Sequence, residues 1–384
     1  MLYLFFIVIC IYCIIQFDIK KKDKQGKKFF YFLLVYLIVL SGFSYRLGVD
    51  IITSEDKYRE VSDMSSMSWR YLNSFYGKMP GWIFFCTICK TIVSSFWFLK
   101  LIHAIIVNTL IFLAIKNNIK YVFSGILVYF CLIYFEFNFQ ILRESIAISV
   151  FLFSLRYFYD QKWTKYYLMV IICISFHESA IVLLFIPIIR YFKTNFFSLS
   201  IVTGLAILII VFAQNISDYL LSMYLSGDIS DKIAYYSEDI DTNKAIAVVN
   251  FLINVVFPVT CLFVFKEELM KVKYVMLIIV YALIYSMGLW LPIMYRFNQY
   301  FILLYFFFYL EIFKILSYKL DKKKRQVSLL YFTLYLIFIL FRARMYFTVT
   351  DSGQPVYVQY YPYSSIFTKE VDANREKYFI YYKY

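Results

Sequence analysis

Long apolar blocks, separated by short polar loops, run through most of this sequence and constrain its fold more than any other feature. A helical block of about 20 residues, rising 1.5 Å per residue, crosses a hydrocarbon core of roughly 30 Å. Composition agrees, because 62% of the 384 residues are hydrophobic and 23% are aromatic, whereas soluble domains are roughly 45–50% apolar. The sequence therefore predicts an all-α, polytopic integral membrane protein whose solvent is the lipid bilayer.

Basic residues concentrate in the short loops and give the chain a formal net charge of +14. A nucleic-acid partner is not expected, because such binding needs basic residues on one face of a folded soluble surface. Lys and Arg in short loops stay on the cytoplasmic side of the cytoplasmic (inner) membrane instead. The first block, 1–17, lacks a basic start and a small-residue cleavage site, and six lysines follow it between residues 20 and 28. We expect an uncleaved first span that starts outside.

Placing the basic loops inside divides the chain into twelve expected spans, with both termini on the outer side. The segment 81–95 is the exception, because counting it as a span would invert every later loop. We interpret it as a re-entrant or interfacial helix, and a thirteenth span is the alternative. The expected spans are 1–17, 29–45, 97–116, 121–136, 143–158, 165–176, 178–192, 197–214, 245–265, 274–291, 297–316 and 327–342.

Three stretches face outward in this arrangement: 46–80, 216–244 and the C-terminal tail 343–384. The second carries six acidic residues against two lysines, a bias opposite to that of the inner loops. The tail is rich in tyrosine, which favours an interfacial aromatic belt, with a sugar-stacking surface as the alternative. No hydrophilic module is large enough for a separate domain, so residues 1–384 are expected to form a single transmembrane domain.

All seven cysteines lie inside apolar runs, among them Cys10-x-x-Cys13 and Cys86-x-x-Cys89. This spacing fits a metal or redox site only with further ligands nearby, and neither pair has a second pair or a histidine beside it. We therefore expect these thiols to pack within the membrane domain. Neither a metal nor a cofactor is expected.

His177 lies between two apolar runs, 165–176 and 178–192, that are both too short to cross a membrane comfortably as α-helices. Twelve helical residues rise only about 18 Å. Since both runs are expected to start from inner basic loops, the turn at His177 and Glu178 is recessed below the outer surface. A histidine there can exchange protons near neutral pH, and a histidine bonded to a neighbouring carbonyl is the alternative. His103, in the middle of a span, is expected to be structural.

Other charged residues are expected at the same outer depth. Arg143 and Glu144 open a span at its outer end, Arg296 has the same placement, and Arg46 follows the second span and precedes Asp50. A guanidinium suits phosphate, because its planar fork donates two parallel hydrogen bonds and stays charged. The alternative is that the arginines only snorkel to lipid headgroups and that the carboxylates are local counter-ions.

Several short motifs, in their order along the chain, resemble those of the EpsG family of Wzy-like polysaccharide polymerases. The strongest likeness is an Arg-led helix followed by a Phe-His-x-Ser-Ala segment. Met79 stands where the family has an acid, and Glu144 stands where it usually has Gln. The motifs are Arg46-Leu-Gly48-Val-Asp50, Met79-Pro80-Gly81-Trp82, Arg143-Glu-Ser-Ile-Ala147, Phe176-His177-Glu-Ser-Ala180, Arg296-Phe-Asn-Gln-Tyr300-Phe301 and Tyr361-Pro362-Tyr363.

The resemblance implies a GT-C-like membrane glycosyltransferase that joins oligosaccharide repeat units on the outer face of the cytoplasmic membrane, in capsule, O-antigen or exopolysaccharide synthesis. It would move a growing chain from one polyprenyl pyrophosphate (diphosphate) to a sugar hydroxyl of another lipid-linked unit. A chain-length regulator and a flippase of the same pathway are the further partners that this implies. The alternatives are a lipid-linked oligosaccharide flippase, which usually shows symmetry between its halves, and a membrane glycan acyltransferase, which would also use a recessed histidine.

This reaction, if the resemblance holds, assigns roles to the charged residues. A diphosphate leaving group needs cations as its charge develops, and the attacking hydroxyl needs a base within hydrogen-bond reach. The implied site residues are His177, Glu178 and Asp50 for the base, Arg143, Arg296 and Arg46 for the diphosphate, and Glu144, Tyr300, Tyr361 and Tyr363 for the rest of the substrate.

Overall fold

The computed structural model describes residues 1–21, 25–66, 79–191, 204, 244–288, 294–320, 326–350 and 352–383. Within these ranges the regular structure is helical, and the β pairing is confined to two isolated bridges, Ser44 with Ser365 and Val349 with Pro355. The predicted all-α class is therefore confirmed for the part of the chain that is described. The expected span 197–214 and the outer loop 216–244 lie outside the described residues, except for Gly204 and Lys244.

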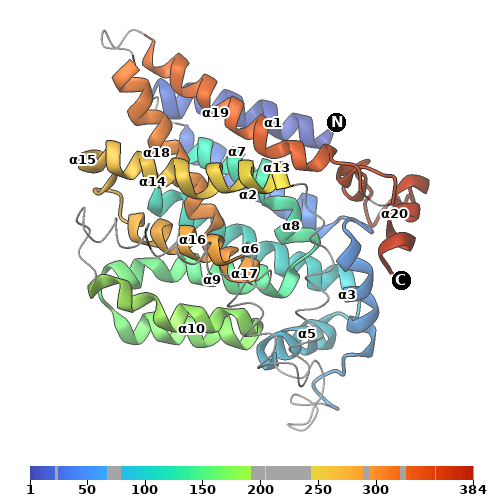
Figure 1. Ribbon diagram of the computed structural model, residues 1–384. Helices are drawn as coiled ribbons and strands as arrows, with labels where there is room; N and C mark the ends of the chain where they lie inside the picture. Colours follow the sequence, from blue (N-terminus) through green and yellow to red (C-terminus); the bar gives the residue numbers. More distant parts are fainter. Residues whose placement is uncertain are drawn as a thin grey trace. The chain divides into compact units, whose positions relative to one another are not determined.

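The chain divides into two compact units, Met1–Ile181 with Phe332–Tyr384, and Val182–Tyr331; we call them unit 1 and unit 2 and describe each by itself (Figure 1). The single domain 1–384 stays a prediction. Unit 1 contains α1 (Leu2–Cys13), η1 (Ile14–Ile19), α2 (Gly26–Gly42), α3 (Val49–Glu60), α5 (Pro80–Ile92), α6 (Phe96–Asn118), α7 (Val122–Leu132), α8 (Tyr134–Phe139), α9 (Leu142–Tyr159), α10 (Trp163–Phe176), η4 (Arg344–Phe347), η5 (Val356–Gln359) and α20 (Ala373–Lys383). Unit 2 contains α13 (Lys244–Phe251), η3 (Leu252–Val256), α14 (Phe257–Val264), α15 (Lys266–Leu269), α16 (Val275–Gly288), α17 (Met294–Asn298) and α18 (Ile302–Leu320), while η2 (Glu178–Tyr191) and α19 (Val327–Ala343) cross the boundary.

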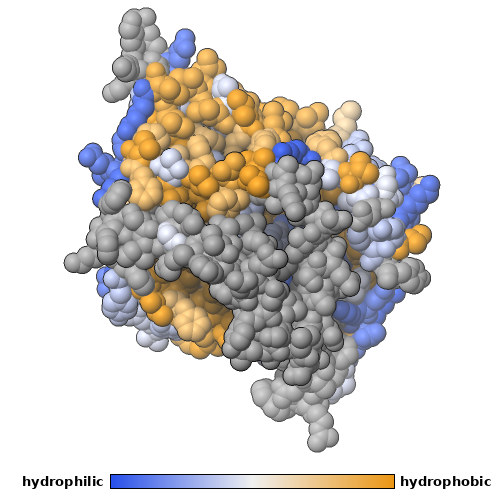
Figure 2. Space-filling model, viewed as in Figure 1, coloured by the Kyte–Doolittle hydropathy of each residue, from blue (hydrophilic) through white to orange (hydrophobic). Residues whose placement is uncertain are grey.

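Three described helices are long and apolar enough to cross a membrane: Leu2–Ile19, Phe96–Asn118 and Val327–Phe347. Several shorter apolar helices of 10–17 residues accompany them, so the protein is a helical membrane protein and the count of twelve spans stays a prediction. Figure 2 shows apolar side chains gathered over α19, where Leu340 is 70% exposed. Exposure of such an apolar surface to water costs free energy, whereas its exposure to lipid does not. A lipid environment is what the sequence predicted.

The two short runs beside His177 form different helices. The first is the α-helix α10, whose 14 residues rise about 21 Å, as the sequence predicted. The second is the 3-10 helix η2, also of 14 residues and with Pro187 inside it. A 3-10 helix rises about 2.0 Å per residue, so η2 extends over about 28 Å. This length comes close to the roughly 30 Å of the hydrocarbon core, so the shortfall of the second run is smaller than the rise of an α-helix implied, and the prediction that it is too short to cross comfortably stays a prediction.

Hydrogen bonds join one end of unit 1 to the C-terminal tail, and we call this end the tail end. They involve the start of α1, the end of α2 and the break between α8 and α9. The pairs are Tyr3 OH with the Tyr360 carbonyl (2.8 Å), Tyr45 N–H with the Ser364 carbonyl (2.8 Å), and Gln140 Nε2 with Gln359 Oε1 (2.8 Å). These are the ends that the sequence placed on one side of the membrane. Which side that is stays a prediction.

The helix α5, in the segment interpreted as re-entrant or interfacial, begins and ends near the tail end. Before its first turn, Met79 Sδ accepts a hydrogen bond from Arg143 at the start of α9 (3.2 Å). Near its last turn, Lys90 Nζ donates to the carbonyls of Tyr58 (3.2 Å) and Arg59 (2.7 Å) at the end of α3. Thirteen residues rise about 20 Å, less than the hydrocarbon core. The contacts favour a helix that lies across the tail end.

Candidate functional site

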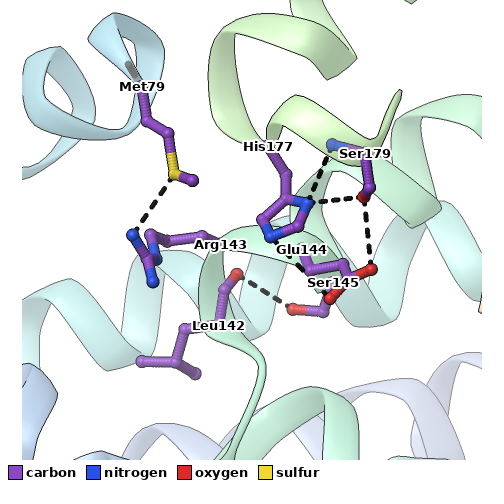
Figure 3. Close-up of polar contacts among 7 residues, drawn as sticks. All are labelled: Met79, Leu142, Arg143, Glu144, Ser145, His177 and Ser179. Atoms are coloured by element: carbon purple, nitrogen blue, oxygen red, sulfur yellow. Dashed lines mark hydrogen bonds and ion pairs between the residues drawn. The ribbon is translucent and has the colours of Figure 1, made fainter. Parts of the chain in front are cut away.

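A buried cluster of His177, Ser179 and Glu144 lies at the tail end of unit 1 (Figure 3). His177 follows the last residue of α10, where its extended backbone (φ −152°, ψ 129°) stops the helix. Its Nδ1 lies 2.6 Å from Ser179 Oγ, which also donates to Glu144 Oε1 at 3.4 Å. Its other ring nitrogen, Nε2, lies 3.9 Å from Glu144 Oε2. The structure thus places both ring nitrogens beside oxygen groups of the cluster.

The geometry of Ser179 links the imidazole to the carboxylate. Its backbone N–H donates to His177 Nδ1 at 3.4 Å, which favours the tautomer with the proton on Nε2, the nitrogen that faces Glu144. Its hydroxyl carries a single proton and lies within reach of both Nδ1 and Oε1. Once the ring is protonated on both nitrogens, Nδ1 can donate to the hydroxyl oxygen, and the hydroxyl proton then bonds to Glu144. The serine can therefore exchange hydrogen bonds between the two groups while the ring stays in place.

Close packing of α9 against α10 holds this cluster together. Ala147 is fully buried, and Cys173 Sγ donates to its carbonyl at 3.2 Å, so the two helices lie side by side (Figure 1). Gly81 plays the same part for α5, because a Cβ at this position would lie 2.9 Å from Ser175 Cβ and 3.0 Å from its carbonyl carbon. The small residues in two of the motifs are therefore required by helix packing.

His103 supports the site by hydrogen bonds to the start of α9, a contact that the sequence did not show. Its Nε2 lies 3.0 Å from the Leu142 carbonyl and 2.9 Å from Ser145 Oγ, both in the first turn of α9. Because a carbonyl oxygen only accepts, Nε2 carries a proton and donates to it. The residue is structural, as expected, and it fixes the turn that presents Arg143 and Glu144.

Arg143 lies beside the cluster, in the first turn of α9, with its guanidinium directed to Met79 (Figure 3). The thioether of Met79 is a weak acceptor without charge. The N-terminus of an 18-residue helix such as α9 also attracts anions, because its backbone dipoles point that way. The charge and the helix end together favour an anionic ligand here.

Arg46 and Asp50 lie elsewhere at the tail end. Arg46 Nη2 forms a half-buried ion pair with Glu376 of α20 at 2.8 Å, and Asp50 is an exposed residue in the first turn of α3. Between them, Gly48 has a φ of +85°, and a Cβ there would clash with the Phe139 backbone. The glycine of this motif is therefore explained by backbone geometry, and the roles of the two charged residues stay predictions.

The remaining predicted residues are not brought into the cluster. Glu178 is exposed next to His177, and Tyr361 is 54% exposed. The Tyr363 hydroxyl donates to the Leu40 carbonyl at 3.1 Å, which ties the tail to the end of α2. Arg296, in α17, and the buried Tyr300 belong to unit 2 and are described within that unit. Their predicted substrate contacts stay predictions.

Ser179 is the functional candidate that the sequence reasoning missed, although it stands inside the Phe-His-x-Ser-Ala segment that carried the resemblance. Among the described residues, no group of three or more His, Cys, Asp or Glu side chains could hold a metal ion. The described cysteines form no disulfide, and all but Cys131 are buried.

The fold and this cluster define a helical membrane protein with a buried His-Ser-Glu group beside a helix N-terminus and an arginine. The chain belongs to the EpsG family, whose family model matches residues 27–365. This match confirms the resemblance seen in the motifs and points to a polysaccharide-polymerase-like membrane protein. A search of curated proteins and a search of solved structures each found no match, so the GT-C-like architecture stays a prediction.

Proposed function

We propose that the protein is a glycosyltransferase that polymerises polyprenyl-diphosphate-linked oligosaccharide repeat units at the outer face of the cytoplasmic membrane. The observation that carries the proposal is the approach of His177, Ser179 and Glu144 to Arg143 at the start of α9. Membership of the EpsG family supports it.

The proposed reaction matches the chemistry of these groups. A sugar hydroxyl of the acceptor forms a bond to the anomeric carbon of the donor, whose bond to the diphosphate oxygen breaks. The diphosphate leaves with the electron pair, and Arg143 and the N-terminus of α9 stabilise its charge. The hydroxyl proton passes to Nδ1 of His177, the ring nitrogen without a proton in this tautomer, while Nε2–H stays directed to Glu144. Glu144 holds the ring and compensates the charge that forms on it, as a buried carboxylate does in a catalytic triad.

The test uses purified full-length protein, the cognate lipid-linked repeat unit and a gel that separates products by chain length. Wild-type protein should make a ladder of polymers, and His177→Ala should lose at least about a hundredfold in rate, as expected for a general base. Arg143→Ala should lose a similar factor, because a transition-state cation is removed. Arg296→Ala and Arg46→Ala test the further diphosphate candidates in the same assay.

Arg156 provides a matched control, because it is an exposed arginine at the other end of the same helix α9. Arg156→Ala should keep the wild-type rate, so a loss in Arg143→Ala cannot reflect the general loss of a cation. No polymer from wild-type protein and its cognate substrate would overturn the proposal. Transport of the lipid-linked unit without polymer, or acyl transfer to it, would identify one of the alternative functions instead.

A further inference from the structure

A second cationic site lies at the tail end of unit 1, in a cavity of about 420 Å³. This volume falls within the range of small-molecule sites, roughly 300–1,000 Å³. Four cations line the cavity, Arg46, Arg59, Lys100 and Lys369, against one carboxylate, Glu55. Arg46 pairs with Glu376, and Arg59 pairs with Glu55 and Asp56. Lys100 and Lys369 are therefore the two lining cations without an ion-pair partner among the described residues, and they favour an anionic ligand.

The start of α6 adds to this charge. Ser95, Phe96 and Trp97 line the same cavity and form the N-cap and first turn of the 23-residue helix, whose positive dipole end therefore borders the cavity. Inside it, Lys100 is 96% buried and its Nζ donates to the Ser44 carbonyl at 2.6 Å. A buried lysine, a helix N-terminus and arginine side chains are together groups that bind phosphate.

The position of the cavity places such an anion at lipid headgroup depth. Phe96–Asn118 is a candidate membrane span, so the first turn of α6 lies near one boundary of the hydrocarbon core. The end of α2 reaches the same place through the bond between Lys100 and Ser44. Tyrosine and tryptophan side chains gather at this depth, and Tyr45, Tyr58 and Trp97 line the cavity. A diphosphate attached to a membrane lipid would lie here.

The helix α5 fixes how far this cavity lies from the His177 cluster. Met79, before its first turn, contacts Arg143, and Lys90 binds the carbonyls of Tyr58 and Arg59, two residues that line the cavity. Eleven residues separate Met79 from Lys90, which corresponds to about 17 Å along the helix. One diphosphate cannot bridge that distance. An oligosaccharide that carries its diphosphate at one end and its reacting hydroxyl at the other can.

We propose that this cavity binds the diphosphate of the acceptor lipid, while the start of α9 binds the diphosphate of the donor. The inference rests on the proposed function, because polymerisation joins two lipid-linked units and leaves the acceptor's own diphosphate intact. The acceptor's reacting hydroxyl then reaches the His177 cluster from a distance set by α5. Arg46 is thereby assigned to the second diphosphate instead of to the leaving group.

The experiment measures binding of undecaprenyl diphosphate to the full-length chain in phosphatidylcholine nanodiscs, by native mass spectrometry. Wild-type protein should bind two molecules. Arg59→Gln with Lys369→Asn should weaken one of them about tenfold for each cation removed. Both side chains are on the surface, and asparagine tolerates the φ of +50° at position 369. Arg143→Gln should weaken the other molecule, and Arg156→Gln should weaken neither.

The inference is overturned if wild-type protein binds one molecule, or if the double variant binds both as wild type does. It is also overturned if phosphatidylglycerol at equal amount displaces the second molecule, which would show general binding of anionic headgroups. The inference is likewise overturned if the double variant binds undecaprenyl diphosphate as wild type does but no longer binds an acidic oligosaccharide, because the cavity would then bind a charged sugar. Two bound lipids without polymer formation would contradict the proposed function alone, and polymer formation with an unaffected double variant would contradict the inference alone.

Discussion

The Ser179 hydroxyl offers the sharpest test of how the cluster works. Ser179→Ala removes the oxygen that lies 2.6 Å from His177 Nδ1 and 3.4 Å from Glu144 Oε1, and leaves the backbone N–H of residue 179 in place. The imidazole then keeps one longer contact on this side and gains freedom to rotate. We expect a protein that folds and binds its substrate but reacts slowly.

The size of the effect follows from the hydrogen bonds that are lost. A bond to a group that becomes charged contributes about 1.5–3 kcal/mol, and each 1.4 kcal/mol in the barrier changes the rate about tenfold. The bond at 3.4 Å is at the limit of useful geometry and adds little. Ser179→Ala should therefore lower kcat by about ten- to hundredfold, less than His177→Ala, while KM for the lipid-linked unit stays close to its wild-type value.

The assay follows release of polyprenyl diphosphate and chain length over a range of substrate concentrations. Ser149→Ala is the matched control, because Ser149 is a buried serine of α9 whose hydroxyl donates to a carbonyl of its own helix, that of Ile146. It should keep the wild-type kcat. Ser179→Thr restores a hydroxyl and should recover part of the rate. A wild-type kcat in Ser179→Ala, together with an inactive His177→Ala, would refute the positioning role.

Three further predictions concern packing and charge. Gly81→Ala forces its Cβ against Ser175 and should cost about 1–3 kcal/mol, seen as a lower Tm, and should reduce the rate by moving α5 away from α9. Asp18→Ala leaves the first backbone N–H groups of α7 without their buried carboxylate partner and should cost about 1–3 kcal/mol, with Asp18→Asn closer to wild type in a thermal melt. Lys319 donates to Glu268 at 3.1 Å and lowers the pKa of that carboxyl, so the pair stabilises the fold above the ordinary pKa of Glu and ceases to do so as the pH falls through the lowered value. Lys319→Gln should therefore lower Tm slightly at pH 7 and leave it unchanged near pH 3, and an equal loss at both would exclude the pair as the cause.

Helical class and the approach of distant helix ends could be predicted from the sequence, because hydrophobic length and basic loops obey one-dimensional rules. His177 and Glu144 could be chosen as candidates, since charged groups within apolar segments are costly and therefore mark function. The residues that contact them could not be predicted in the same way. The contact between His177 and Ser179 needs the extended backbone that ends α10, and the bond from His103 to Leu142 joins residues 39 positions apart. Hydropathy has no information on either.

The 3-10 geometry of η2 could not be predicted either, because its apolar run fits both kinds of helix equally well. The motifs divided in a way that the sequence did not anticipate. The glycines of two motifs are explained by close packing, because a Cβ at Gly48 would clash with the Phe139 backbone and a Cβ at Gly81 would clash with Ser175. In the segment from His177 to Ala180, the serine is explained by its hydrogen bond to the imidazole of His177. A motif therefore locates a site without saying which of its residues touch the substrate.

The short helix α5 connects the membrane topology to the proposed chemistry. If α5 crossed the bilayer, its first and last turns would lie about 30 Å apart along the membrane normal, and Met79 could not contact the start of α9 while Lys90 binds the end of α3 at the same end of unit 1. Both contacts exist, which favours the interpretation of α5 as a re-entrant or interfacial helix. The length of α5 then separates two cationic sites along the membrane surface instead of across it. In the proposed reaction two lipid-linked substrates lie side by side in one leaflet, and a helix in that orientation would hold their diphosphates a repeat unit apart.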